Sequence, residues 1–262
     1  SYGDNCAILN VGRNIHVCIG WDYVGGGLGR FIVRRASPTG QVLLTGPTTV
    51  TPLSWHYVEW YVSIHDTEGI VEIYIDGAPY ASVTGADTRA YADTGISIRM
   101  SANAPTVCSF CDIYAASGRS FFGDCVVDTV LPSGAGDLTQ WTPSTGANWQ
   151  NVDDAFPDSD STYNSAASAG LRDSFAHTTF PSRPTSRNWA VQLGVVARKE
   201  AGGGGSYSPS WRIGGANYDE PEVFLTDSYL YKFAARTTHP GDLSEWTESQ
   251  LNSAQPGYVR VT

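Results

Sequence analysis

The sequence predicts an all-β protein of two sandwich-like domains, with one short helix near the C-terminus. Its 262 residues suit two domains of ordinary size. Aromatic residues make up 12% of the chain, and only 16% of residues are charged. Aromatic and β-branched residues favour half-buried strands, while the 28 glycines and 14 prolines favour turns between them. We expect one β-sandwich over 1–130 and a second over 131–262.

Short strand-like runs separated by turn residues begin near the N-terminus. The first four predicted strands cover Cys6–Val11, 15–21, 29–35 and 41–44. The segments between them are rich in Gly, Asn, Ser and Pro, the residues that form turns. Strands at this spacing are typical of a sandwich or a barrel.

The clearest strand pattern lies at 55–64. One face of this strand is predicted to be apolar, and it carries Val58, Trp60, Val62 and Ile64. The other face is predicted to carry Tyr57, Glu59, Tyr61 and Ser63. A turn at 66–69, a second alternating run at 71–75 and the turn pair Asp76-Gly77 complete a β-meander.

Further strands are predicted along the rest of the chain, at 107–114, 189–198, 210–214, 223–225, 228–237 and 258–261. The glycine run at 202–205 is interpreted as a hairpin tip, because strand patterns flank it. Thr247 and Gln250 have the spacing of a helix capping box, with Trp246 and Leu251 on the packing side.

The meander resembles a known fold. The run WHYVE at 55–59, followed by a strand, a glycine turn and VEIYIDG at 71–77, resembles the core of laminin-G/concanavalin A-like jelly rolls. The resemblance implies a lectin/glucanase-like sandwich for the first domain, with strands at 96–100, 107–114 and 121–130 that return across it. The opening strand of that family is not evident before Cys6, so we expect an open edge that a neighbouring subunit covers. A homo-oligomer is therefore expected, with a trimer favoured.

A second resemblance covers much of the chain. It rests on FGDCVVD (122–128), LP (131–132), GD (136–137), TQWTPSTG (139–146), NW (148–149) and VD (152–153). It continues in DSDSTY (158–163), AVQL (190–193), ARK (197–199) and WTESQLN (246–252). This succession resembles virion structural proteins of tailed bacteriophages. The resemblance implies a capsid decoration, fibre or tail component that is assembled in the host cytoplasm and contacts other virion proteins or a host-surface glycan.

The charge distribution argues against nucleic-acid binding. The formal net charge is −10, and the acidic excess is spread over both halves of the chain. Such a surface repels phosphate backbones, and no stripe of Lys or Arg offsets it. The sequence also lacks a run of 18 apolar residues, so no membrane contact is expected.

Five cysteines occur, an odd number that cannot pair fully within one chain. Cys108 and Cys111 have the spacing of half a zinc site or a redox pair, but no second close pair follows. We therefore expect free, mostly buried thiols and assembly in a reducing cytosol.

Catalysis is not expected. Glu72 and Asp76 are spaced i, i+4 on one strand face, as paired acids of glucanases are. Asp76 precedes Gly77, however, so a turn residue and a solvated strand face explain the two acids more simply. The five histidines are dispersed and have no zinc-site spacing. We expect a non-enzymatic structural protein, and the alternative is a lectin-like carbohydrate-binding module or an inactive glucanase relative.

Two loop clusters are candidate binding sites. Trp141 and Trp149 lie in a Thr/Pro/Ser/Gly loop where their rings could stack on a sugar, with Asn148 and Asp153 binding its hydroxyls. The alternative is that the two rings are buried anchors of the loop.

The second cluster is acidic and follows directly. Asp154, Asp158 and Asp160 could clasp a calcium ion through carboxylates and loop carbonyls, although the run is not an EF-hand. The alternative is an exposed acidic loop. No other cofactor is expected.

Overall fold

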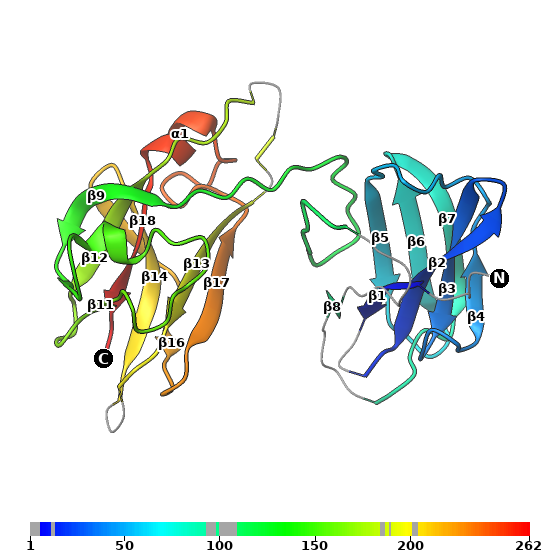
Figure 1. Cartoon of the computed structure of the whole chain (residues 1–262), viewed down its shortest axis with the longest axis horizontal. Helices are drawn as coiled ribbons and strands as arrows, with labels where there is room; N and C mark the ends of the chain where they lie inside the picture. Colours follow the sequence, from blue (N-terminus) through cyan, green and yellow to red (C-terminus); the bar gives the residue numbers. More distant parts are fainter. Residues whose placement is uncertain are drawn as a thin grey trace. The chain divides into compact units, whose positions relative to one another are not determined.

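The computed structural model describes residues 6–11, 14–92, 98–99, 109–183, 187–188, 190–200 and 204–262. The chain divides into two compact units, Ser1–Val127 and Asp128–Thr262, called here the N-terminal and C-terminal units. The described residues form antiparallel sheets and one α-helix near the C-terminus (Figure 1), which confirms the predicted all-β class.

The N-terminal unit contains two antiparallel sheets. The first has the order β4-β3-β2-β1-β8, and the second has the order β5-β6-β7. The strands of the first are β1 (Cys6–Val11), β2 (Val17–Gly25), β3 (Leu28–Arg35), β4 (Val42–Thr45) and β8 (Ile98–Arg99). The strands of the second are β5 (Val58–Ser63), β6 (Gly69–Ile75) and β7 (Ala78–Ala86).

The core of this unit lies between the two sheets. Alternate residues of β2 and β3 are buried against alternate residues of β6, and the cluster comprises Val17, Ile19, Phe31, Val33, Val50, Val71 and Ile73. The predicted apolar face of β5 packs on it with Val58, Trp60, Val62 and Ile64. Figure 1 shows these blue and cyan strands packed as a sandwich. The turn prediction is also confirmed, since Asp76 and Gly77 join β6 to β7 with φ of 51° and 77°.

The edge at β1 differs from the expectation. β1 pairs with β2 on one side, and Asn10 and Val11 pair with Arg99 and Ile98 of β8 on the other. At these two positions the edge that was expected to be open is therefore closed within the chain.

The segment at 109–127, called here the strap, corrects two strand predictions. Strands were expected over 107–114 and 121–130, but the described residues 109–131 contain none. The reason is that the strap is held mainly by side chains, and Glu59, Glu72 and Asp112 accept hydrogen bonds that a strand ladder would otherwise provide. The alternation of apolar residues in the strap therefore does not correspond to a β-strand.

The C-terminal unit is built on a six-stranded sheet with the order β15-β14-β18-β12-β9, in which β16 also pairs with β14. These strands are β9 (Pro132–Thr139), β12 (Arg172–His177), β14 (Ser206–Ile213), β15 (Ala216–Asp219), β16 (Val223–Phe224) and β18 (Gln255–Arg260). Two smaller sheets pair β10 (Thr142–Pro143) with β11 (Asn164–Ser165), and β13 (Val191–Ala197) with β17 (Leu230–Arg236).

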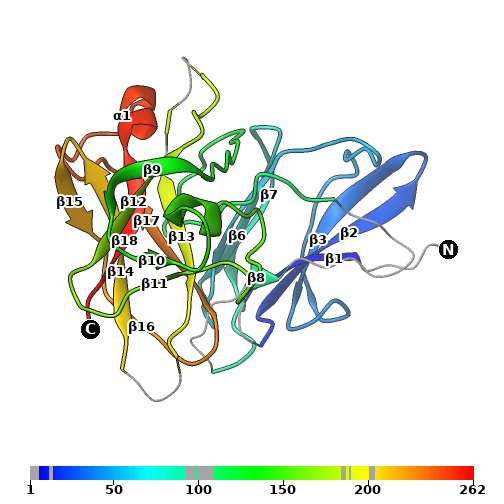
Figure 2. The same ribbon diagram turned by 60° about the vertical axis from the view of Figure 1, so that its left-hand side comes forward.

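Two apolar clusters fill this unit. One contains Trp211, Trp246, Leu251 and Ala254, and the other contains Phe175, Tyr207 and Tyr258. Residues of β13 pack against both, so β13–β17 covers one face of the large sheet. Helix α1 (Glu248–Ser253) lies at one end of that sheet (Figure 2), and its predicted capping box between Thr247 and Gln250 is confirmed.

The predicted hairpin around 202–205 is wrong. The strand before it, β13, pairs with β17, whereas the strand after it, β14, pairs with β15, β16 and β18. The connection therefore leads from one sheet to another. Strand patterns on either side of a glycine run do not show whether the two strands pair with each other. Residues 201–203 themselves lie outside the described ranges.

Candidate functional site

The outward face of β5 and β6 gathers acids and tyrosines, and it is the candidate site. It carries Tyr57, Glu59 and Tyr61 from β5 and the residue before it, and Glu72 and Tyr74 from β6. The antiparallel register places Glu59 opposite Tyr74 and Tyr61 opposite Glu72. Two carboxylates on neighbouring strands thus lie among three phenol rings.

Glu59 is buried although it points away from the core, with only 5% of its surface exposed. The strap lies over it and supplies its partners. The carboxylate accepts hydrogen bonds from the Tyr114 hydroxyl, from the Phe122 backbone N–H at 2.7 Å and from the Gly123 N–H at 3.3 Å. Hydrogen-bonded carboxylates of this kind hold loops in place, because each lost contact would leave a desolvated donor.

Glu72 is bound by the same strap. Arg119 donates through Nε to Glu72 Oε2 at 2.8 Å and through a second N–H to the other oxygen. The guanidinium also lies 5.7 Å from the centroid of the Tyr61 ring, and Phe121 packs on Tyr74 with ring centroids 3.9 Å apart. The Glu72 side chain is only 14% exposed, which corrects the expectation of a solvated strand face.

The hydroxyl groups of Tyr57 and Tyr114 are neutral at physiological pH. Burial raises the pKa of Tyr57, and its hydrogen bond with Tyr114 raises it further. Burial also raises the pKa of Tyr114, and the bond to Glu59 adds to the effect. The pKa of the nearby Cys125 thiol is raised by burial as well, so this thiol lacks the character of an activated nucleophile.

The i, i+4 acid pair suggested by the sequence does not form a working pair. Asp76 lies in the turn, where its Oδ2 is 2.9 Å from His56 Nδ1 and its Oδ1 accepts from the Tyr57 N–H. The hydrogen bond with His56 lowers the pKa of Asp76. Glu72, by contrast, is bound to Arg119 of the strap. The two carboxylates therefore bind different partners, Arg119 for Glu72 and His56 for Asp76.

Three of the four glycan candidates lie together in the C-terminal unit. Trp141 and Trp149 are half-buried against the Phe175–Tyr207–Tyr258 cluster, and Asn148 donates to the Trp141 carbonyl at 2.8 Å. The Trp141 indole N–H donates a hydrogen bond to the Leu171 carbonyl at 3.0 Å. Asp153 is half-buried and takes no part in these bonds. These contacts are those of loop anchors, and glycan binding by this loop stays a prediction.

Asp173 organises this loop. It is 2% exposed, and it accepts hydrogen bonds from the backbone N–H groups of Gln140 and Trp141 at 2.7 and 2.9 Å. Its second oxygen accepts from Asn148 Nδ2 at 2.7 Å. The loop that carries both tryptophans, with the 3-10 helix η1 (Asn148–Asn151), is thus fastened to β12 by one buried carboxylate.

The three calcium candidates do not converge. Asp160 accepts from the Tyr229 hydroxyl at 2.6 Å and from Arg198 at 2.8 Å, and both contacts lower its pKa. Asp158 and Asp154 instead accept from the Thr162 hydroxyl, at 2.8 and 3.5 Å. Within the described ranges, no group of three or more His, Cys, Asp or Glu side chains is placed to hold a metal ion.

Three cysteines have described side chains. Cys18 is buried in β2, where burial raises the pKa of its thiol to about 11, while Cys111 is exposed and Cys125 is half-buried. All three are free thiols. The exposure of Cys111 differs from the expectation of buried thiols, and Cys108 lies outside the described residues.

Sequence reasoning missed the two carboxylates that matter most here, Glu59 and Asp173. The outward position of Glu59 was predicted from the alternation of β5, but its burial depends on the strap, whose contacting residues are 55 to 64 positions away. The burial of an acid on the outward face of a strand has no signature in the neighbouring sequence.

Comparisons with protein-family models, with curated proteins and with solved structures find no match to this chain. None of the helices in the described ranges has the length and apolar character needed to span a membrane.

Proposed function

We propose that this chain is a non-enzymatic structural component on the outer surface of a bacteriophage particle, such as a capsid decoration, fibre or tail protein. The observation that supports the non-enzymatic, structural part of the proposal is that buried acids hold segments of the chain in place. Glu59 holds the strap, and Asp173 holds the tryptophan loop. Glu220 accepts from the Trp211 indole N–H at 3.1 Å and from Arg236.

This use of carboxylates supports a structural role over a catalytic one. A general acid or base must reach the reacting atom of a substrate, and catalytic carboxylates work in pairs at a defined separation. The carboxylate oxygens of Glu59 and Glu72 instead accept hydrogen bonds from N–H groups of the strap. The particle assignment itself rests on the resemblance of 122–153 and later segments to tailed-phage virion proteins.

The same proposal includes contacts with other virion proteins and a homo-oligomer, with a trimer favoured. Two observations support an assembly. Residues 6–9 of β1 pair only with β2 among the described strands, and β17 exposes large aromatic side chains. Open edges and exposed apolar groups are the surfaces that subunit contacts cover.

Labelling of intact particles tests the proposal directly. Antibody raised against the chain is expected to decorate the outer surface of particles of the phage that encodes it, at symmetry-related positions. Absence of the chain from purified particles would overturn the proposal. Light scattering on the purified chain measures the copy number separately. A monomer at all concentrations would contradict the proposed trimer.

The chain is expected to show no glycoside hydrolase activity. Glu59 and Glu72 lie on the same outward face of β5 and β6, and residues of the strap bind both carboxylates. The measurement is reducing-sugar release from mixed β-glucans by the full chain. Turnover that Glu59→Gln or Glu72→Gln abolishes, and that Glu68→Gln leaves intact, would contradict this prediction.

A carbohydrate-binding module is the second candidate. The aromatic side chains of β17 favour it, since Tyr231 is 60% and Phe233 64% exposed. The Phe233 ring lies close over Gly194 of β13, where an added Cβ would be 3.1 Å from the ring. Flat exposed rings on a strand can stack on a pyranose.

A glycan array separates the two candidates. Selective binding that Phe233→Ala or Trp149→Ala removes would favour the lectin, and each variant would identify its own surface. No selective binding is expected from a purely structural component.

A further inference from the structure

The outward face of β5 and β6 binds the strap as a receptor binds an extended peptide. Arg119 and Phe121 stand two positions apart in the strap, and each contacts a different part of the face. The Arg119 guanidinium binds both oxygens of Glu72 and lies 5.7 Å from the centroid of the Tyr61 ring. Phe121 packs on Tyr74 with ring centroids 3.9 Å apart. Recognition of alternate side chains is typical of sites for extended peptides.

The same face also binds the backbone of the strap. Glu59 accepts hydrogen bonds from the Phe122 N–H at 2.7 Å and from the Gly123 N–H at 3.3 Å, and the Tyr114 hydroxyl donates to the same carboxylate. The two surfaces are complementary in charge, because the face supplies two carboxylates and the strap supplies a guanidinium and N–H groups. The segment that is recognised is therefore RSFFG at 119–123.

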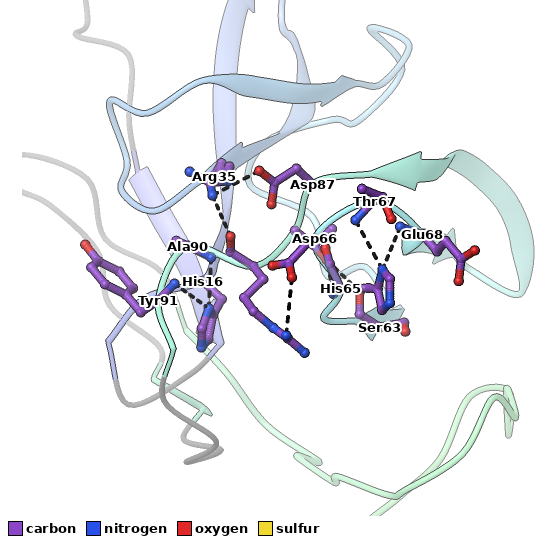
Figure 3. A network of polar contacts seen from close by, with 12 residues as sticks. His16, Arg35, Ser63, His65, Asp66, Thr67, Glu68, Asp87, Ala90 and Tyr91 are labelled. Carbon is purple, nitrogen blue, oxygen red and sulfur yellow. Dashed lines mark hydrogen bonds and ion pairs between the residues drawn. The ribbon is translucent and has the colours of Figure 1, made fainter.

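Another connection of the same unit is attached in a different way (Figure 3). Thr88 follows β7 and is fully buried, and its hydroxyl donates to the Ser63 carbonyl at 2.8 Å. The backbone N–H groups of Thr88 and Arg89 donate to the His65 carbonyl at 3.0 and 3.3 Å. In the strap, by contrast, residues 113–120 are all exposed, and side chains of the sheet make the contacts described above. We therefore expect the strap to leave its sheet more readily than this connection does.

The strap also exposes a group of apolar side chains. Phe110, Ile113, Val126 and Val127 are between 41% and 52% exposed. The Val127 N–H donates to Asp112 Oδ1 at 2.8 Å, which brings the two ends of the strap together and gathers these four residues. Gathered apolar groups at a surface are typical of protein–protein contacts. A second copy that held the strap would lie next to this group, so assembly can cover it.

The strap leads directly into the C-terminal unit, which begins at Asp128. That unit has apolar clusters of its own, which include Trp211 and Tyr258. It can therefore keep its fold while the strap moves from one sheet to another. The contacts at the sheet are the same whether the strap belongs to the same chain or to another copy, so an exchange loses none of them.

We propose that the outward face of β5 and β6 is a receptor for the segment at 119–123 and that, in the assembled protein, each strap occupies the face of a neighbouring copy. The inference rests on the homo-oligomer of the proposed function and names the contact that joins its subunits. In a single chain, the high effective concentration of the strap favours its own face, as the structure shows. In the oligomer, cover for the exposed apolar group favours exchange, and passing each strap to the next copy closes a ring.

Photo-cross-linking of the full chain tests this arrangement. In Phe121→p-benzoylphenylalanine a photoreactive aromatic side chain replaces the ring that contacts Tyr74. Irradiation is expected to join the strap to β6 of another chain, so the main product should have at least about twice the mass of one chain in a denaturing gel. Peptide mapping of isotope-labelled and unlabelled chains that were refolded together then identifies links between chains. The reciprocal variant, Tyr74→p-benzoylphenylalanine, should join the same two segments.

Two further substitutions, each combined with Phe121→p-benzoylphenylalanine, are matched controls. Glu59→Ala removes the acceptor of the strap N–H groups, so the yield of the product with β6 should fall by about tenfold. Glu72→Gln weakens only the contact with the exposed Arg119, so the yield should change little.

Cross-links between the strap and β6 that stay within single chains would overturn the exchange. An oligomer in light scattering together with such internal links would leave the homo-oligomer intact and refute the exchange alone, whereas a monomer at all concentrations would refute both. Absence of a product between the strap and β6 from both photoreactive variants would show that the strap does not occupy this face, and would also overturn the proposal. If the Phe121 variant does not fold, the Tyr74 variant decides the question.

Discussion

Replacing Asp173 with alanine is expected to lower the free energy of unfolding of the C-terminal unit by about 3 kcal/mol or more. The change removes the acceptor of two backbone N–H groups, those of Gln140 and Trp141, and of the Asn148 side-chain amide. Asp173 is 2% exposed, so water cannot readily replace the lost carboxylate. Urea unfolding followed by tryptophan fluorescence measures the effect, because Trp141 lies in the affected loop.

Two further variants make this result specific. Asp173→Asn retains one acceptor oxygen but places an amide N–H₂ against Asn148, so an intermediate loss is expected. Asp137→Ala is the matched control on neighbouring β9, because its exposed carboxylate pairs with Arg212 and Gln255 at the surface. A loss for Asp137→Ala as large as that for Asp173→Ala would show that the burial of Asp173 is not the cause.

The parts of the fold that could be predicted are those with a strong local pattern. The alternation of β5 specified both its buried face and its tyrosine–glutamate face, and Asp76-Gly77 specified the following hairpin turn. The capping box at Thr247 likewise located α1. In each case, neighbouring residues in the sequence decide the structure, so the sequence alone is sufficient.

Other elements lack such a pattern. Strand β9 has the sequence PSGAGDLT, without the β-branched and aromatic residues that mark strands, and its pairing with β12 makes it a strand. Gly136 of β9 illustrates the reason, because an added Cβ would lie 2.6 Å from the backbone carbonyl carbon of Ser174 on β12. Close approach of two backbones selects small residues here, and no single strand shows that requirement.

The candidate site was the least predictable part. Glu72 was singled out because its spacing to Asp76 is visible in the sequence, yet the structure pairs these acids with Arg119 and His56 respectively. Glu59 stood on a correctly predicted face, but its partners come from a segment that was itself expected to form strands. Burial of a polar group depends on the segment that covers it. A segment that is distant in the sequence leaves no periodic pattern around the buried residue.

The strap gives the second large expected effect, in Glu59→Ala. This change removes the one acceptor shared by the Tyr114 hydroxyl and the Phe122 and Gly123 N–H groups. We expect the N-terminal unit to lose about 2 kcal/mol, with the strap opening well below the temperature at which the sandwich unfolds. Limited proteolysis should then cut within 109–127 first, while β5 and β6 remain protected.

Glu72→Gln is the control that makes this prediction sharp. It weakens the contact with Arg119, whose side chain is 53% exposed, and an ion pair with such an exposed partner contributes little in water. The strap should therefore stay closed in Glu72→Gln and open in Glu59→Ala, although both acids lie on the same sheet face and bind the same segment. Equal cleavage of the two variants would mean that the ring contact between Phe121 and Tyr74, together with other apolar packing, holds the strap without help from the buried carboxylate.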